Sequence, residues 1–119
     1  MAPDDLKGLC AWLKCDPARL EIRKDKMAIE VFQAHIESCL ASYPSFPKEA
    51  QRTQRILRRL QKGEPAYPVF VKEGDEAMFI LEGRHRIVAL YQQGVRSVEV
   101  GFVSAKPEPE PKKRPSPGM

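Results

Sequence analysis

The chain has 119 residues, of which 42% are hydrophobic and 30% charged, and its formal net charge is +4. This length favours one small domain, and the longest apolar run, around Met78 to Leu81, is far shorter than the roughly 20 residues of a membrane span. With three cysteines, an odd number, and no secretory signal pattern, we expect a cytoplasmic protein in a reducing compartment.

Residues 1–47 favour helices. Asp4 and Asp5 precede apolar residues at helical spacing, and acidic side chains suit the macrodipole at a helix start. A second helix is predicted over residues 26–42, where one apolar stripe contains Ile29, Phe32, Ile36, Cys39, Leu40 and Tyr43. We therefore expect residues 1–47 to form a helical segment that packs on the rest of the chain.

A third helix, predicted over residues 48–62, has two different faces. Its apolar stripe consists of Thr53, Ile56, Leu57 and Leu60. The opposite side carries the basic residues Lys48, Arg52, Arg55, Arg58, Arg59 and Lys62, against the single acidic residue Glu49. A solvated face explains the position of these charges but not their single sign, because like charges repel and mixed signs serve solubility better. The alternative is that this face binds a nucleic-acid backbone or an acidic protein partner.

After Gly63 the pattern changes to strands rich in β-branched and aromatic residues. The predicted elements are a strand over 68–72, a hairpin turn over 73–76, a strand buried on both faces over 77–81, a helix over 83–93 and a strand over 95–103. This order indicates an α+β or mixed α/β domain. We place its core at 48–103 and a disordered, proline-rich and charge-rich tail at 104–119.

The segment Glu82-Gly83-Arg84-His85-Arg86 lies where the buried strand leads into a helix. First-turn positions favour acidic or hydroxyl side chains, because free backbone N–H groups and the macrodipole make them electropositive. Cations there cost a few tenths to about 1 kcal/mol each. A bound anion would compensate, held by backbone N–H groups and clamped by the two guanidinium groups. The alternative is that the arginines extend into solvent or pair with the glutamate, and that the histidine is a partly buried side chain.

His85 and Glu82 are the candidate catalytic residues. Because the reference pKa of an imidazole is near neutral pH, His85 is equally suited to be a general acid or base, a hydrogen-bond donor to a phosphate or an orienting group. Glu82 is a candidate for orienting Arg86 or for holding Mg²⁺, with a plain ion pair as the alternative. A zinc site built from Cys10, Cys15, His35 and Cys39 is disfavoured, because Cys39 belongs to an apolar stripe.

The segments from the basic helix to the last strand also follow a recognisable pattern. A helix, Gly, Pro-aliphatic-x-Val, a hairpin and then Gly-x-Arg-Arg before a helix that contains Ala is the pattern of ParB partition proteins. The matching positions here are Gly63, Pro68, Val69, Val71, Gly83, Arg86 and Ala89. Sulfiredoxins have Gly-Cys-His-Arg where this chain has Gly83-Arg84-His85-Arg86. Residues 48–103 thus resemble the ParB/sulfiredoxin superfamily.

The resemblance implies a small mixed sheet in which Gly83, Arg84, His85 and Arg86 hold the phosphates of ATP or CTP, with Mg²⁺ as the accompanying ion. Family members bind or hydrolyse these nucleotides, and some are nucleases, kinases or DNA-segregation clamps. We therefore expect an NTP hydrolase or nuclease-type accessory protein of a plasmid, phage or mobile element. The alternative is a non-catalytic regulatory module that binds DNA or an acidic protein through residues 48–62. Arg84 replaces the sulfiredoxin nucleophile, which excludes reduction by that route, and the chain has no room for the ParB helix-turn-helix.

Overall fold

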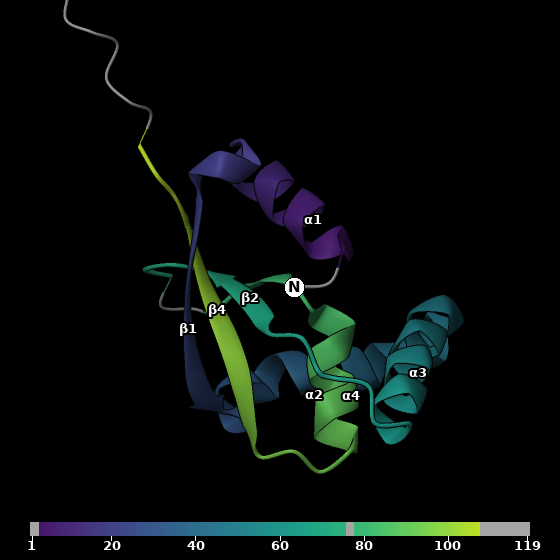
Figure 1. The fold of residues 1–119 in the computed structure, drawn as a ribbon. Coiled ribbons are helices and arrows are strands. Elements are labelled where there is room, and N and C mark those ends of the chain that lie inside the picture. The colour runs from purple at the N-terminus through teal and green to yellow at the C-terminus, as the bar shows by residue number, and fades with distance from the viewer. Residues whose placement is uncertain (1–2, 76–77, 108–119) are drawn as a thin grey trace, which may run out of the picture.

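The structure is a computed structural model that describes residues 3–75 and 78–107. Within those residues a four-stranded mixed sheet forms the centre of the molecule, in the order β1-β4-β2-β3 (Figure 1). The strands are β1 (Leu20–Ala28), β2 (Val69–Lys72), β3 (Ile80–Glu82) and β4 (Ser97–Ala105). Strand β4 pairs in parallel with β2, whereas the β1–β4 and β2–β3 pairs are antiparallel. The fold is therefore mixed α+β, as the sequence predicts.

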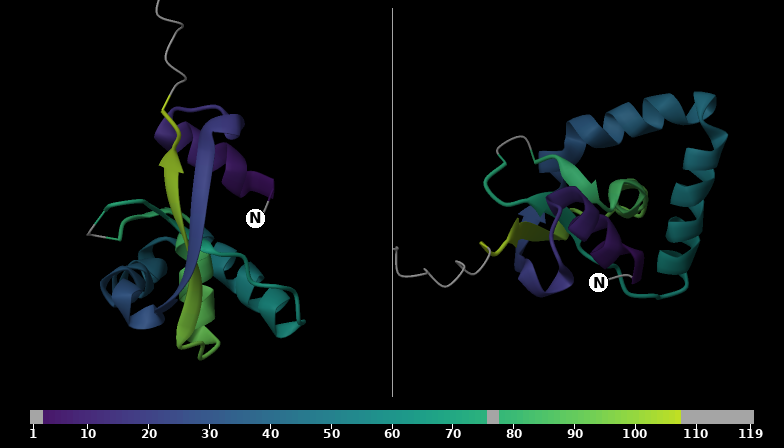
Figure 2. Two further views of the ribbon diagram at one scale, coloured as in Figure 1. Left: turned by 60° about the vertical axis from the view of Figure 1, so that its left-hand side comes forward. Right: turned by 90° about the horizontal axis from the view of Figure 1, so that it is seen from above.

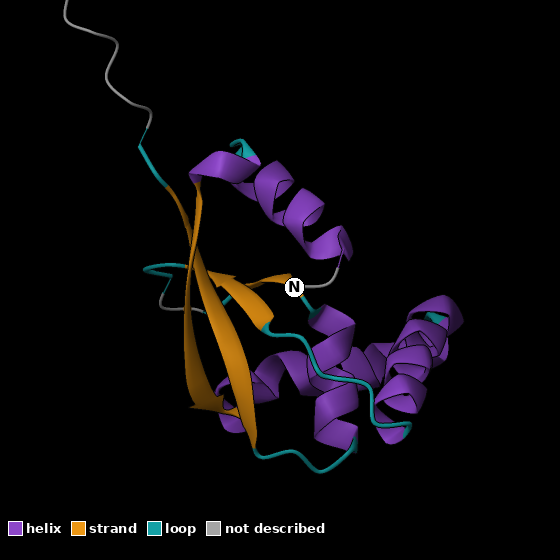
Figure 3. Ribbon diagram, in the orientation of Figure 1, coloured by secondary structure: helices purple, strands orange, loops and turns teal. Residues whose placement is uncertain are grey.

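Helices lie on both faces of the sheet (Figures 1 and 2). Helix α1 covers one face, helices α2 and α4 cover the other, and α3 packs on the outer side of α4. The helices are α1 (Pro3–Leu13), α2 (Gln33–Ser42), α3 (Pro47–Gln61) and α4 (Arg84–Gln92). Short 3-10 helices lie between consecutive elements: η1 (Pro17–Arg19) between α1 and β1, η2 (Ile29–Phe32) between β1 and α2, and η3 (Tyr43–Ser45) between α2 and α3. Figure 3 shows this division between the orange sheet and the purple helices.

Two apolar clusters bury the faces of the sheet, because successive side chains of a strand point to opposite sides. Val69 and Val71 of β2 belong to the larger cluster, under α2 and α4, and Phe70 belongs to the smaller one, under α1. Strand β3 follows the same rule: Ile80 and Leu81 are both buried, in different clusters. Strand β3 is shorter than the strand predicted over 77–81, since it begins only at Ile80.

The helix predicted over residues 26–42 is wrong in its first part. Residues 20–28 form strand β1, and α2 begins only at Gln33, although Ile29, Phe32 and Ile36 of the predicted stripe are buried. The strand pairs along its whole length with β4, from Leu20 opposite Ala105 to Ala28 opposite Ser97. Such a ladder joins residues far apart in the chain, so the local apolar spacing did not predict it.

The C-terminal boundary also differs from the prediction. Ser104 and Ala105, which we expected in a disordered tail, belong to β4. The next residue is held as well, because the Arg19 guanidinium donates hydrogen bonds of 3.0 and 2.8 Å to the Lys106 carbonyl. The rest of the predicted tail, from residue 108, and the end of the predicted hairpin turn, at residues 76–77, lie outside the described residues. No helix in the described ranges is long and apolar enough to cross a membrane.

Candidate functional site at the start of helix α4

Strand β3 passes into helix α4 through Gly83, which has φ +103°, in the left-handed region. An added Cβ at Gly83 would also lie 3.3 Å from the Val69 Cα atom, so glycine is required here for conformation and for space. No side chain caps the helix, and the first intrahelical bond runs from the Ile87 N–H to the Gly83 carbonyl, at 3.0 Å. The backbone N–H groups of residues 84–86 therefore have no acceptor within the helix.

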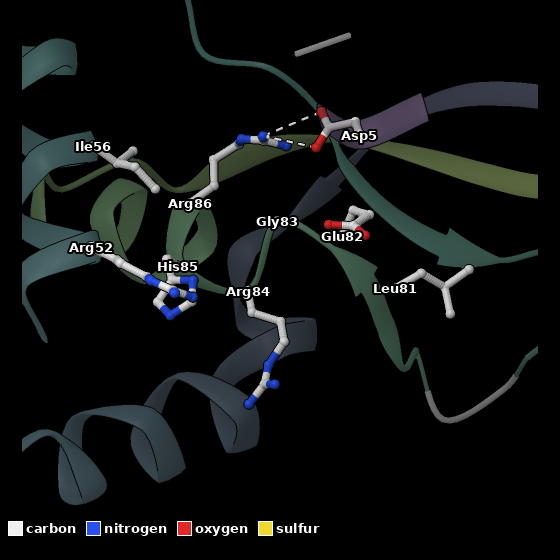
Figure 4. Close-up of a pocket in the computed structure, with 9 residues that line it drawn as sticks. All are labelled: Asp5, Arg52, Ile56, Leu81, Glu82, Gly83, Arg84, His85 and Arg86. Atoms are coloured by element: carbon white, nitrogen blue, oxygen red, sulfur yellow. Dashed lines mark hydrogen bonds and ion pairs between the residues drawn. The ribbon is translucent and has the colours of Figure 1, made fainter. Parts of the chain in front are cut away.

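A pocket of about 270 Å³ opens at this helix start (Figure 4). Arg52 and Ile56 of α3, Asp5 of α1 and residues 81–86 line it. The lining therefore contains three guanidinium groups, two carboxylates and one imidazole. The contacts within this set decide which of the positive charges is available to a ligand.

Arg86 is held by the protein itself. Its Nη2 atom lies 3.3 Å from both carboxylate oxygens of Asp5, its Nη1 atom donates to the Pro68 carbonyl, and its guanidinium carbon lies 5.8 Å from the Tyr67 ring centroid. The ion pair is nearly buried, with 12% of the Arg86 side chain and 6% of the Asp5 side chain exposed. Arg86 therefore joins α1, α4 and the segment before β2, and its expected place on a phosphate is taken by internal groups.

Arg84 has the opposite surroundings. Its side chain is exposed and extends away from Asp5, whereas Arg86 extends toward it (Figure 4). Among the described residues no carboxylate lies within ion-pairing distance of Arg84, which lines a neighbouring pocket together with Cys39 of α2. The two arginines therefore diverge, and the clamp of two guanidinium groups on one anion that we expected is not formed.

His85 pairs with Glu49, a residue of α3. The imidazole Nε2 atom hydrogen-bonds to Glu49 Oε2, and this bond is the main reason why the Glu49 pKa is below its usual value. Arg52 Nη1 lies 4.0 Å from the other carboxylate oxygen, Oε1. Because Glu49 occupies Nε2, the other ring nitrogen, Nδ1, is the one left for a ligand.

Glu82 lies on the other side of Gly83 from His85 (Figure 4). Burial raises the pKa of its carboxyl, the neighbouring Asp5 raises it further, and Arg86 opposes the change. The carboxyl sits against the α1 backbone, since an added Cβ at Gly8 would come within 1.7 Å of Glu82 Oε1. The structure does not bring the two candidate catalytic residues together, and Asp5, not Glu82, is the ion-pair partner of Arg86.

The basic residues predicted on the third helix are all on the surface, on α3 or, for Lys62, directly after its last residue. Arg52, Arg55, Arg58, Arg59 and Lys62 are exposed, and of these Arg52 also lines the pocket at the start of α4. On the opposite side Thr53 is buried and its hydroxyl hydrogen-bonds to Tyr43 Oη. The predicted division of this helix into two faces is confirmed.

The set of cysteines and histidine does not form a metal site. Within residues 3–75 and 78–107 no group of three or more potential ligands is arranged to hold a metal ion. His35 Nε2 lies 3.4 Å from Cys39 Sγ, and burial lowers the His35 pKa and raises the Cys39 pKa. Both residues therefore favour their neutral forms.

Sequence reasoning missed Asp5 and Glu49, the partners of the two site residues. In the sequence Asp5 is an acidic residue at a helix start, and Glu49 is the one acidic residue in a basic helix. Asp5 is 81 positions from Arg86, and Glu49 is 36 positions from His85, so no local pattern joins them.

Comparison with known proteins finds no matching family model, no matching curated protein and no matching solved structure. The likeness to the ParB/sulfiredoxin superfamily therefore rests on the motif alone and stays a prediction. A function for this chain has to be argued from the geometry of its own site.

Proposed function

We propose that the protein binds the phosphate groups of a nucleotide, ATP or CTP, in the pocket at the start of helix α4. One observation carries the proposal: the uncapped first turn of α4 and the exposed Arg84, which has no carboxylate partner among the described residues, line the same pocket. The ligands would be the backbone N–H groups of residues 84–86 and the side chains of Arg84, Arg52 and His85.

The physical basis is the sum of two favourable terms. A helix N-terminus presents free N–H groups and roughly half a positive charge, which suits an anion. An arginine adds a planar pair of donors that matches a phosphate group. The pocket, at about 270 Å³, is smaller than sites that enclose a whole nucleotide, so it suits the phosphates with the nucleoside outside.

Glu82 is the residue that would hold a Mg²⁺ ion brought in with a nucleotide. Its carboxylate lines the pocket, has no ion-pair partner among the described residues, and has Asp5 as an electrostatic neighbour. A nearby cation stabilises the ionised form of a carboxyl group with these surroundings. Mg²⁺ is commonly bound by one or two carboxylates together with substrate phosphates. Bound Mg²⁺ would supply charge neutralisation of the phosphates.

The hydrolase or nuclease activity is a separate prediction from binding. His85 and Glu82 lie on opposite sides of Gly83, so they do not form a joint acid–base pair in this conformation. Phosphate release is therefore measured alongside binding, and its absence leaves the binding proposal intact.

Isothermal titration of the full chain with ATP, CTP and inorganic triphosphate, each with and without Mg²⁺, tests the proposal. We expect Arg84→Ala to weaken binding about tenfold or more, because a charge-assisted hydrogen bond contributes about 1.5–3 kcal/mol. Arg96→Ala is the matched control, since Arg96 is an exposed arginine beyond the other end of α4. Absence of binding by the wild-type protein, or equal binding by Arg84→Ala, would overturn the proposal.

A further inference from the structure

Five of the basic residues of α3 lie in one line along the helix. Lys48, Arg52, Arg55, Arg59 and Lys62 are separated by four, three, four and three positions. At 100° per residue they fall within about 80° of the helix circumference, and their Cα atoms span about 21 Å with roughly 5 Å between neighbours. Lys62, the residue after the last turn, keeps helical dihedral angles, so the line continues to it. We call these five residues the α3 stripe.

The α3 stripe lies on the surface of the molecule, although Arg52 and Arg59 also line pockets toward α1 and α4. All five side chains are exposed, and α3 packs on α4 at the edge of the molecule (Figure 2). Among the described residues the carboxylate contact of the stripe is the one between Arg52 and Glu49, at 4.0 Å. Arg55, Arg59 and Lys62 therefore have no acidic partner within that part of the chain.

A stripe of this kind destabilises its own helix. Like charges three and four positions apart repel by about 0.2–0.5 kcal/mol for each pair. The neighbouring positions Gln51, Gln54 and Gln61 are uncharged, so they do not relieve the repulsion. Negatively charged groups of another molecule would relieve this repulsion.

We propose that the α3 stripe binds the phosphate backbone of a nucleic acid. The charges repeat regularly along a rigid helix, as phosphates repeat along a strand, and three of the five are arginines, whose planar donors match phosphate oxygens. An acidic protein partner is less well matched, because protein interfaces have apolar or aromatic anchors at their centre and the stripe has none. Binding is independent of base sequence, since the stripe makes contacts to phosphate only.

This surface is distinct from the phosphate pocket, although Arg52 borders both. A polymer along α3 does not need the first turn of α4, and a nucleotide at α4 does not need Arg55 or Arg59. The two proposals therefore succeed or fail separately, and Arg52 is left unchanged in the variants that test them.

Fluorescence anisotropy with a labelled 24-base-pair duplex of mixed sequence, and with one of its single strands, tests the inference on the full chain. Five phosphate contacts predict a slope of log affinity against log salt of about −4.5 for the duplex between 50 and 200 mM NaCl. The double variant Arg55→Gln/Arg59→Gln lowers the magnitude of this slope by about 2 and weakens binding on the order of 50-fold at 100 mM salt. It retains nucleotide binding, whereas Arg84→Ala retains nucleic-acid binding.

Lys26→Gln/Arg96→Gln is the matched control, because it removes two exposed positive charges from β1 and from the turn before β4. We expect its affinity to stay within twofold of the wild-type value. Circular dichroism spectra like that of the wild type establish that both double variants are folded. No binding by the wild type at 50 mM salt, or equal losses in the two double variants, would overturn the inference. Displacement of the duplex by polyglutamate as readily as by unlabelled duplex would overturn it too, in favour of an acidic protein partner.

Discussion

The start of helix α4 and the outer face of helix α3 both concentrate positive charge, and they differ in what surrounds it. At α4, Arg86 and His85 have carboxylate partners from distant segments, Asp5 and Glu49. On α3, Arg55 and Arg59 have none among the described residues. Misplaced cations in a first helical turn can therefore be stabilised from within the fold, and they indicate a ligand only where such partners are missing.

Arg84 is the residue of the α4 site that resembles the α3 stripe. It is exposed and lacks a carboxylate partner in the described part of the chain, although Arg86, two residues later, is nearly buried in an ion pair. The contrast separates a structural role for Arg86 from a binding role for Arg84. Variants that remove each type of contact test this separation.

The largest expected effect is that of Asp5→Ala on stability. This change leaves Arg86 nearly buried without its carboxylate, and breaking a buried pair by removing one partner costs about 3 kcal/mol. Urea unfolding measures the loss. Asp4→Ala removes an exposed carboxylate one position earlier and should change the unfolding free energy by no more than about 0.5 kcal/mol. Equal effects of the two variants would show that Arg86 does not depend on Asp5.

An intermediate effect is expected for Gly83→Ala. The left-handed conformation strains any residue with a Cβ atom, and here the new atom would also meet Val69 Cα at 3.3 Å and Arg86 Nη1 at 3.2 Å. We expect a loss of about 2 kcal/mol in unfolding free energy. Gly63→Ala is the control, because Gly63 has φ +87° and open space around the added atom, so strain alone costs about 1 kcal/mol. A larger loss at Gly63 would contradict the close packing at Gly83.

The smallest expected effect has the opposite sign. Arg55→Glu replaces like-charge neighbours by opposite-charge pairs with Arg52 and Arg59, at i−3 and i+4, and should raise the unfolding free energy by about 0.5 kcal/mol. Urea unfolding at 20 mM NaCl measures the gain, and 1 M NaCl should abolish most of it through screening. A destabilisation would mean that Arg55 has a partner within the protein.

Much of the fold and part of the site follow from local sequence. The two-faced α3, the strand β2 and the turn at Gly83 are predicted correctly because each depends on side chains within a few positions of one another. The site residues 82–86 are likewise placed at a strand-to-helix turn. What could not be predicted is the direction of each side chain there: Arg84 and Arg86 are alike in sequence, and their separate surroundings come from α1 and α2.

The sequence by itself determined the helical periodicity of α3 and α4, the glycine stops after them and the line of basic residues along α3, since 3.6-residue spacing is a property of the chain alone. Only the tertiary structure decided that residues 20–28 form a strand, because their hydrogen-bond partners are the residues of β4. It also decided which basic side chains have a carboxylate partner, since Asp5 and Glu49 reach α4 only after α1 and α3 have packed. Electrostatic partners are set by distance in space, and that distance is fixed by packing rather than by position in the chain.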